Sequence, residues 1–214
     1  MKKKLFLAMG LMSGTSMDGV DMSIIYSDGN KDISFIFDEY FKYDQVLNMQ
    51  IVNLRNRLLN ASDLEKYSKE IDLLEKNITL FHANIINQVL SKLNYKIDLI
   101  GFHGQTIFHN PEIKVTKQLG DGYLLSQLVK KTVVYDFRQA DIFNNGQGAP
   151  LTPIFHYLLA NKIVEKYKFK FPISILNIGG ISNITQITGT SNKVEENIMA
   201  LDIGPGNCMI DDWI

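Results

Sequence analysis

The chain has 214 residues, 45% hydrophobic and 21% charged, which is typical of a globular protein with one large domain or two small ones. The net charge of −1 gives no overall attraction to nucleic acid or to a membrane surface. The single cysteine, Cys208, excludes an internal disulfide, and we expect a cytoplasmic protein. No apolar run approaches the roughly 20 residues of a membrane helix. The basic start of the chain lacks the pattern of a signal peptide.

Three strands are predicted at the start of the chain. Residues 4–10 form a short apolar run, and residues 20–27 (VDMSIIYS) and 33–43 (ISFIFDEYFKY) form two more. The DGN sequence at 28–30 is a strong hairpin signal. The three strands are therefore predicted to pair as a meander.

A long helix is predicted to follow the meander. Ser62 and Glu65 match a capping box, and apolar residues then recur at three- and four-residue steps as far as Val89. A strand from residue 97, a short helix and a second buried strand at 132–137 come next. This alternation predicts an α/β fold with a mixed sheet and helical crossovers.

A domain boundary is predicted near residue 170. After a polar stretch from Asp136, the chain becomes helical behind Pro150, and the helical pattern ends at about Lys168. We therefore place a first domain at 1–170 and the beginning of a second at 171–214.

The second domain repeats the plan of the first. PISILNIGGISNITQI (172–187) is a strand, a small-residue turn and a strand, as is the segment 4–25, and each is followed by a third apolar strand. Such self-similarity indicates duplicated domains, although two independent glycine-rich hairpins would give the same pattern.

The stretch GLMSGTSMDGVD (10–21) places three glycines, two aspartates and three hydroxyl side chains directly after a strand. It is not a Walker P-loop, because the Gly-Lys-Ser/Thr element is missing. Amides in such a turn can nevertheless form an anion-binding concavity, and Asp18 or Asp21 could hold a hydrated magnesium ion. A purely structural hairpin is the alternative.

The stretch GFHGQTIFH (101–109) is predicted to lie at the end of a strand, where open α/β sheets collect ligands. His103, Gln105 and Thr106 could hydrogen-bond a sugar or a phosphate. The alternative is that His103 is a structural residue in a turn.

Two further segments carry charged residues. DFRQAD supplies Asp136, Arg138 and Asp141, which fit a binding site or a structural ion-pair cluster, and the following GQGAPL leads into a helix N-terminus that favours anions. In ALDIGPGN (200–207), Asp202 follows an apolar strand and precedes a stiff turn. This position suits a general base, whose carboxylate must be held in a fixed orientation. An aspartate that only hydrogen-bonds its own turn is the alternative. Together, the motifs are explained by a nucleotide held between two related domains.

Five stretches occur in a fixed order: GLMSGTSMDGVD, GFHGQTIFH, DFRQADIFNNGQGAPL, NIGGISNIT and LDIGPGNCMIDDWI. In these motifs the chain closely resembles the anhydro-N-acetylmuramic acid kinases of the actin, Hsp70 and sugar-kinase superfamily. The resemblance implies two ribonuclease-H-like (actin-like ATPase) domains around a cleft for ATP and sugar. It also implies conversion of 1,6-anhydro-N-acetylmuramic acid, a product of peptidoglycan turnover, to the 6-phosphate with consumption of one water, a step of cell-wall recycling.

The resemblance also implies roles for individual residues. The ATP phosphates would be contacted by Ser13, Gly14, Thr15, Ser16, Met17, Asp18, Gly19 and Val20. The sugar side would be lined by His103, Gln105, Thr106, Arg138 and Asp141. Asp202 matches the family's catalytic aspartate, which would deprotonate the water that attacks C1 while O6 takes the γ-phosphoryl group. Mg²⁺ would neutralise developing phosphate charge, with no ligand assigned, and Asn145 stands where the family often has glycine.

Family members extend well beyond the DDWI segment, so we expect this chain to hold only three strands and the start of a helix of the second domain. We expect poor stability unless a partner covers this sheet, either a second copy in a homodimer or a separate second half. An inactive truncated fragment or a sugar-binding module is the alternative function. Another sugar kinase or an Hsp70-like ATPase is a third interpretation, which the shared set of motifs disfavours.

Overall fold

The computed structural model describes residues 4–191, 193–211 and 213. These fall into two compact units, unit 1 at residues 1–146 and unit 2 at residues 147–214. Of the helices in the described ranges, none combines the length and the apolar character that a bilayer crossing requires.

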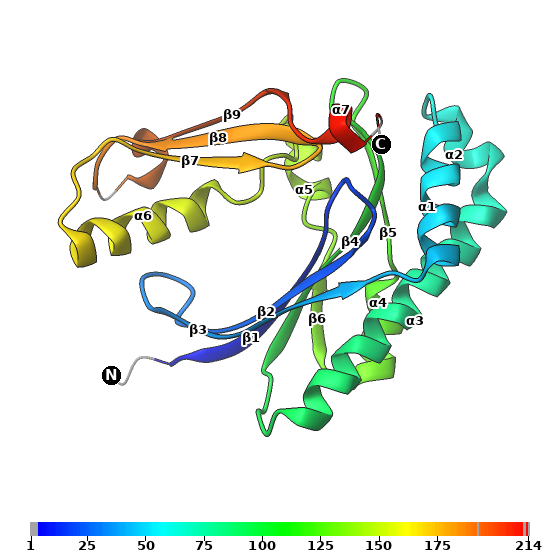
Figure 1. The fold of residues 1–214 in the computed structure, drawn as a ribbon, viewed down its shortest axis with the longest axis horizontal. Coiled ribbons are helices and arrows are strands. Elements are labelled where there is room, and N and C mark those ends of the chain that lie inside the picture. The colour runs from blue at the N-terminus through cyan, green and yellow to red at the C-terminus, as the bar shows by residue number, and fades with distance from the viewer. Residues whose placement is uncertain (1–3, 192, 212, 214) are drawn as a thin grey trace. The chain divides into compact units, whose positions relative to one another are not determined.

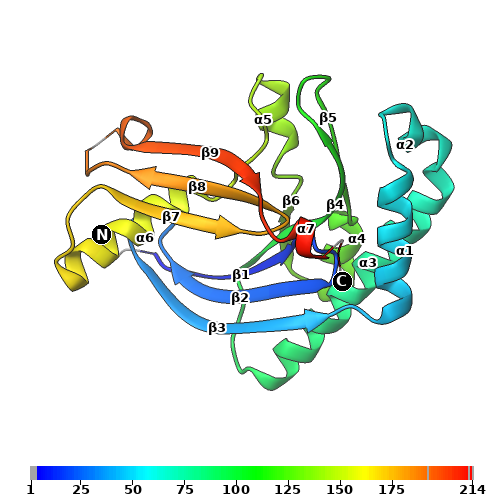
Figure 2. The ribbon, with the colours of Figure 1, turned by 45° about the horizontal axis from the view of Figure 1, so that its top comes forward.

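Unit 1 is a mixed sheet with flanking helices (Figures 1 and 2). Its strands are β1 (Phe6–Ser13), β2 (Gly19–Ser27), β3 (Ile33–Lys42), β4 (Leu99–Asn110), β5 (Val115–Leu119) and β6 (Thr132–Tyr135). Its helices are α1 (Gln45–Arg57), α2 (Ser62–Lys66), α3 (Ser68–Lys92), α4 (Gly122–Val129) and α5 (Gln139–Phe143).

The sheet has the order β3-β2-β1-β4, and β6 and then β5 pair with the other edge of β4. Strands β1, β4 and β6 are parallel, whereas β2 is antiparallel to both of its neighbours. The predicted meander and the predicted mixed sheet are therefore both confirmed.

The core of unit 1 lies between this sheet and the helices. Alternate β1 side chains, Leu7, Met9 and Leu11, are buried because successive residues of a strand point to opposite faces. Helix α3 adds an apolar stripe, of which Ile78 and Ile86 are fully buried. Figure 1 shows α1 and α3 along the same side of the sheet.

The helical region differs from the sequence prediction in two respects. Helix α1 was not predicted; its N-cap is Asp44, whose carboxylate accepts a hydrogen bond from the Leu47 amide at 2.9 Å. The long helix expected from Ser62 is two helices that meet at Tyr67. Ser62 caps no helix, because it is the first residue inside α2 and its hydroxyl donates to Asn60 Oδ1.

Unit 2 is an antiparallel three-stranded sheet and one long helix. It contains α6 (Pro153–Tyr167), β7 (Ile173–Ile178), β8 (Ile181–Ile187), the 3₁₀ helix η1 (Val194–Asn197), β9 (Ile198–Pro205) and α7 (Cys208–Asp211). The sheet order is β7-β8-β9, which is a meander like β1-β2-β3. Helix α6 begins at Pro153 rather than directly behind Pro150.

The two compact units divide at Gly146, whereas the domain boundary was predicted at residue 170. The difference is the position of α6, which packs on β8 and β9 of unit 2. One contact between them is the 2.8 Å hydrogen bond that joins His156 Nδ1 of α6 to the hydroxyl of Thr185 on β8. The sequence prediction assigned this helix to the domain that precedes it.

Candidate functional site

Three hydrogen bonds fix the loop between β1 and β2 to the rest of unit 1. The Gly14 carbonyl accepts from Gln105 Nε2 at 2.9 Å, the Met17 carbonyl accepts from Asn48 Nδ2 at 2.8 Å, and the Asp18 carbonyl accepts from the Tyr43 amide at 2.9 Å. The loop is thus a fixed element of unit 1, anchored from three different parts of the chain.

The predicted nucleotide residues divide into buried and exposed members. Ser13 is buried, with its hydroxyl 2.9 Å from that of Tyr43. The side chains of Met17 and Val20 are also buried, so these residues could reach a ligand only through their backbone. Thr15 and Ser16 are exposed, and no hydrogen bond of their amides is found in the described part of the chain. These two amides are the anion donors that the loop offers.

Two carboxylates follow these amides. Burial acts to raise the pKa of Asp18, but hydrogen bonds from Ser16 and Tyr40 outweigh it and hold the pKa below its ordinary value. The pKa of Asp21 is raised by burial and by the charge of Asp18. Asp18 is therefore the more strongly anionic of the two and the better candidate for a cation.

The predicted sugar motif lies inside β4 and not at a strand end, which corrects the sequence prediction. The parallel pairing of β4 with β6 ends at Phe102, and its pairing with β1 ends at Gln105. Strand β4 then continues as a hairpin with β5. The carboxyl ends of β1 and β6 nevertheless meet at this motif, as is typical of ligand sites in such sheets.

His103 and Arg138 form one unit within this site. His103 Nδ1 donates to the Gly104 carbonyl at 2.7 Å, and Nε2 then accepts from Arg138 Nη2 at 2.8 Å. Burial, and to a lesser extent the charge of Arg138, lowers the pKa of His103 to about 4. His103 is therefore neutral at pH 7 and orients the guanidinium.

Gln105, Thr106 and Asp141 have different surroundings. Gln105 is fully buried and holds Gly14, whereas the half-buried Thr106 has a hydroxyl with no hydrogen-bond partner among the described residues. Asp141 is exposed and packs against Gly146, where a Cβ would lie 2.2 Å from its Oδ2. A hollow of about 240 Å³ adjoins His103 and is lined by the Lys117–Glu75 ion pair (2.6 Å) and by Gln139.

Asp202 lies on β9, opposite Asn183 of β8, and is exposed. The strand continues past it to Pro205, so Asp202 precedes the strand tip at which it was predicted. The following turn is fixed to the turn between β7 and β8. The amides of Gly206 and Asn207 donate to the carbonyls of Gly180 and Gly179 at 2.9 and 2.8 Å.

The contact between the turn after β9 and the turn between β7 and β8 requires glycine at position 206, because a Cβ there would lie 1.9 Å from the Gly179 carbonyl oxygen. The two glycine-rich segments of unit 2 therefore form one rigid backbone structure beyond Asp202.

Sequence reasoning missed the residues that support the loop. Asn48 lies in the unpredicted helix α1 and Tyr43 just after β3, and neither belongs to a motif.

Within the described ranges, no three His, Cys, Asp or Glu side chains gather as a metal site.

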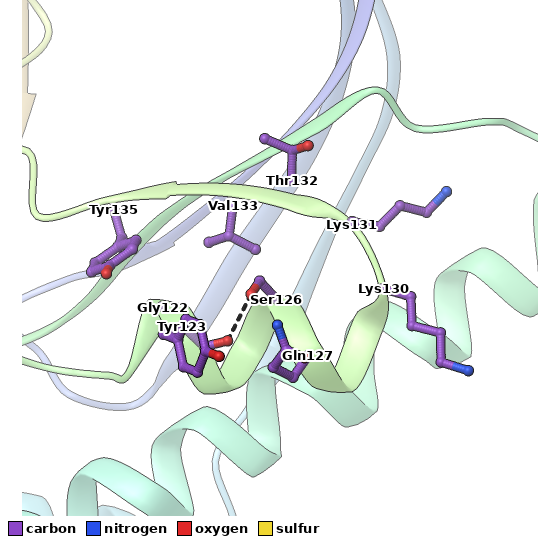
Figure 3. Close-up of a pocket in the computed structure, with 9 residues that line it drawn as sticks. All are labelled: Gly122, Tyr123, Ser126, Gln127, Lys130, Lys131, Thr132, Val133 and Tyr135. Atoms are coloured by element: carbon purple, nitrogen blue, oxygen red, sulfur yellow. Dashed lines mark hydrogen bonds between the residues drawn. The ribbon is translucent and has the colours of Figure 1, made fainter.

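A larger hollow, of about 500 Å³, lies between α4 and β6, and its lining includes Lys130, Lys131 and Tyr135 (Figure 3). In this region the Ser126 hydroxyl donates to the Tyr123 carbonyl at 2.7 Å. None of the predicted site residues lines this hollow.

The sheet of unit 1, with β2 antiparallel in a β3-β2-β1-β4-β6 order and an anchored glycine loop behind β1, defines a ribonuclease-H-like domain of the actin-like ATPase class. A solved structure of an exopolyphosphatase-like protein is similar in fold, with a TM-score of 0.50 and 10% sequence identity over 96% of this chain and 52% of that one. Residues 6–214 match the family model of anhydro-N-acetylmuramic acid kinase, and the chain belongs to this family.

Curated relatives agree with this assignment. The anhydro-N-acetylmuramic acid kinase of Pelagibacter ubique is 51% identical over 99% of this chain, and that of Agrobacterium fabrum is 39% identical over 97%. The matches cover 55% and 54% of those two proteins. The chain therefore spans about half the length of the curated relatives it matches.

Proposed function

We propose that the chain is the part of an ATP-dependent sugar kinase that carries the phosphate loop and the catalytic base. The substrate would be 1,6-anhydro-N-acetylmuramic acid and the product N-acetylmuramic acid 6-phosphate, in cytoplasmic cell-wall recycling. The observation that carries the proposal is the anchored loop, whose Thr15 and Ser16 amides are without partners in the described part of the chain.

The residues present suit MgATP. Amides of a glycine-containing turn bind phosphate oxygens, and the ionised Asp18 carboxylate suits a hydrated Mg²⁺. Bound MgATP would supply the γ-phosphoryl group and neutralise the charge that develops on it. Thr15 and Ser16 would orient the phosphates, and the neutral His103 would hold Arg138 toward the sugar.

Asp202 would act as general base on water. It would take a proton from the water that attacks C1, the C1–O6 bond would break, and O6 would take the γ-phosphoryl group of ATP, with ADP as the leaving group. One water and one phosphoryl group are consumed, so the bridge is opened and phosphorylated in the same reaction. The exposure of Asp202 and the rigid turns beside it support this role.

The direct test is incubation of the chain with Mg²⁺, ATP and the anhydro sugar, alone and with a polypeptide matching the remaining length of the Pelagibacter relative. We expect the 6-phosphate by mass spectrometry and ³¹P NMR, at a higher rate in the mixture. Saturable sugar binding without product in either sample would instead favour a sugar-binding module. Neither binding nor product would contradict both functions.

We also propose a partner for unit 2, the part of the family's chain that lies outside these residues. On the sheet face that does not contain Thr185, one cross-strand row consists of Leu176, Ile184 and Leu201. Leu176 and Leu201 are 52% and 42% exposed, and Ile178 on the same face is 64% exposed. The related meander in unit 1 is covered by helices, so amphipathic helices of the remaining length suit this open face.

Changing both Leu176 and Leu201 to lysine is expected to weaken association with that polypeptide by at least about 10-fold, because two charges would be buried. Sedimentation velocity of the mixture measures this. A matched control changes Tyr167 and Phe169, which are exposed apolar residues outside the sheet, to lysine. A homodimer that ignores the added polypeptide would identify a second copy as the partner instead.

A further inference from the structure

The backbone carbonyls of the loop between β1 and β2 determine where its amides point. In a planar trans peptide, the C=O of one residue and the N–H of the next point in opposite directions. The Gly14 carbonyl accepts from Gln105 of β4, so the Thr15 N–H points away from β4. The Met17 carbonyl accepts from Asn48 of α1, so the Asp18 N–H points away from α1 and donates to the carboxylate of Asp18 itself.

Both side-chain donors are themselves held in place. Gln105 is fully buried and pairs with Ser13 in the parallel register of β1 and β4. Asn48 lies in the first turn of α1, where the Asp44 cap fixes the helix start. Each amide group therefore reaches the loop from a rigid element, and the connecting distances of 2.9 and 2.8 Å are those of full hydrogen bonds.

The loop requires such support because its backbone includes a disfavoured conformation. Met17 has a φ of +58°, in the left-handed region that a residue other than glycine or asparagine rarely adopts. Its buried side chain and the Asn48 bond to its carbonyl both act against relaxation to a commoner conformation.

We propose that Asn48 and Gln105 are positioning residues for phosphate binding. Gln105 orients the Thr15 amide toward the ligand, and Asn48 holds the Met17 peptide on the other side of the Thr15 and Ser16 amides. They act through the backbone carbonyls of the loop. Gln105 is thereby reassigned from the sugar side to the nucleotide side of the site. The inference rests on the proposed function for the identity of the anion, a nucleoside triphosphate with its magnesium ion.

The test is Asn48→Ala in the 214-residue chain, with Asn53→Ala as control. Both asparagines lie on α1, and Asn53 is exposed, so the two changes have similar effects on helix propensity. ¹⁵N relaxation of the unliganded chain reports the order of the Thr15 and Asp18 amides, and NMR titration with MgATP and with magnesium tripolyphosphate reports binding.

We expect Asn48→Ala to lower the order of the Asp18 amide and to raise the Kd for both ligands about 3- to 10-fold, as for one lost hydrogen bond. Asn53→Ala should change neither readout, and Asn48→Ala should melt a few degrees below it, because only Asn48 makes a hydrogen bond to the loop. Gln105→Met, which keeps the size of the buried side chain, should have the same effect at Thr15.

Unchanged loop order and unchanged Kd in Asn48→Ala would overturn the positioning role. A wild-type loop that is ordered but binds neither ligand would instead overturn the proposed function at this loop. In that case the ¹⁵N relaxation of the loop amides in Asn48→Ala still shows whether Asn48 holds the backbone. Failure of the positioning role can therefore be distinguished from failure of the proposed function.

Discussion

Asp202→Asn is expected to lower the rate of 6-phosphate formation by at least about 100-fold, because an amide cannot take the proton from the attacking water. The exposed position predicts a change of unfolding free energy within about 0.5 kcal/mol. The rate is measured in the mixture of the chain with the remaining length of the Pelagibacter relative, at saturating MgATP and sugar. A loss confined to kcat would identify a group that acts in the transition state.

Glu195→Gln is the matched control, since it makes the same carboxylate-to-amide change at another exposed position of unit 2. It should retain the full rate. Equal rates for the Asp202 and Glu195 variants would remove Asp202 from the reaction, even if the family assignment and the phosphate loop both stand.

Mild acid is expected to destabilise unit 1 by about 2 kcal/mol for each of two buried histidines between pH 7 and pH 5. Burial lowers the pKa of His82 and of His103 to about 4 in the folded state, from 6.5 in the unfolded chain. The unfolded chain therefore binds more protons below pH 6.5. The stability present above that pH is lost as the pH falls toward 4.

His82 offers the cleaner test of this effect. It is fully buried on α3, its ring lies 4.8 Å from that of Phe102, and Nε2 has no partner among the described residues. His82→Leu should remove about half of the loss between pH 7 and pH 5. The unfolding free energy can be taken from exchange of the slowest amides of β1 and β4.

Ile78→Leu, a change at another fully buried position of α3 that does not titrate, provides the comparison and should keep the full pH dependence. A His82 variant that loses as much stability as the wild type would assign the acid sensitivity to other groups, such as paired carboxylates. Since His103 also orients Arg138, it should not be replaced in this experiment.

Periodicity in the sequence predicted most of the sheet. The strands at 20–27 and 33–43 agree with β2 and β3 to within one residue at each end, because alternating apolar residues and the DGN turn constrain them locally. Helix α1 was not found, since its buried face consists of three residues, Leu47, Ile51 and Leu54, among polar neighbours.

The sequence predicted which residue types form the site but not which of them contact one another. The sequence marks the loop and the residues His103, Gln105 and Arg138 as polar groups near strand ends. It cannot show that Gln105 reaches back 91 positions to a loop carbonyl, or that His103 meets Arg138. The first contact depends on the register of β1 against β4 and the second on that of β6 against β4, and only the folded sheet fixes these registers.

The sheet order of unit 2 places Asp202 on an outer strand, because β9 pairs with β8 on one side and with no other strand in the described ranges. The outward N–H and C=O groups of β9 are a template for another strand. We therefore expect the chain to associate edge to edge at high concentration, which would cover the strand that carries the proposed base, so that specific activity should fall as the protein concentration rises.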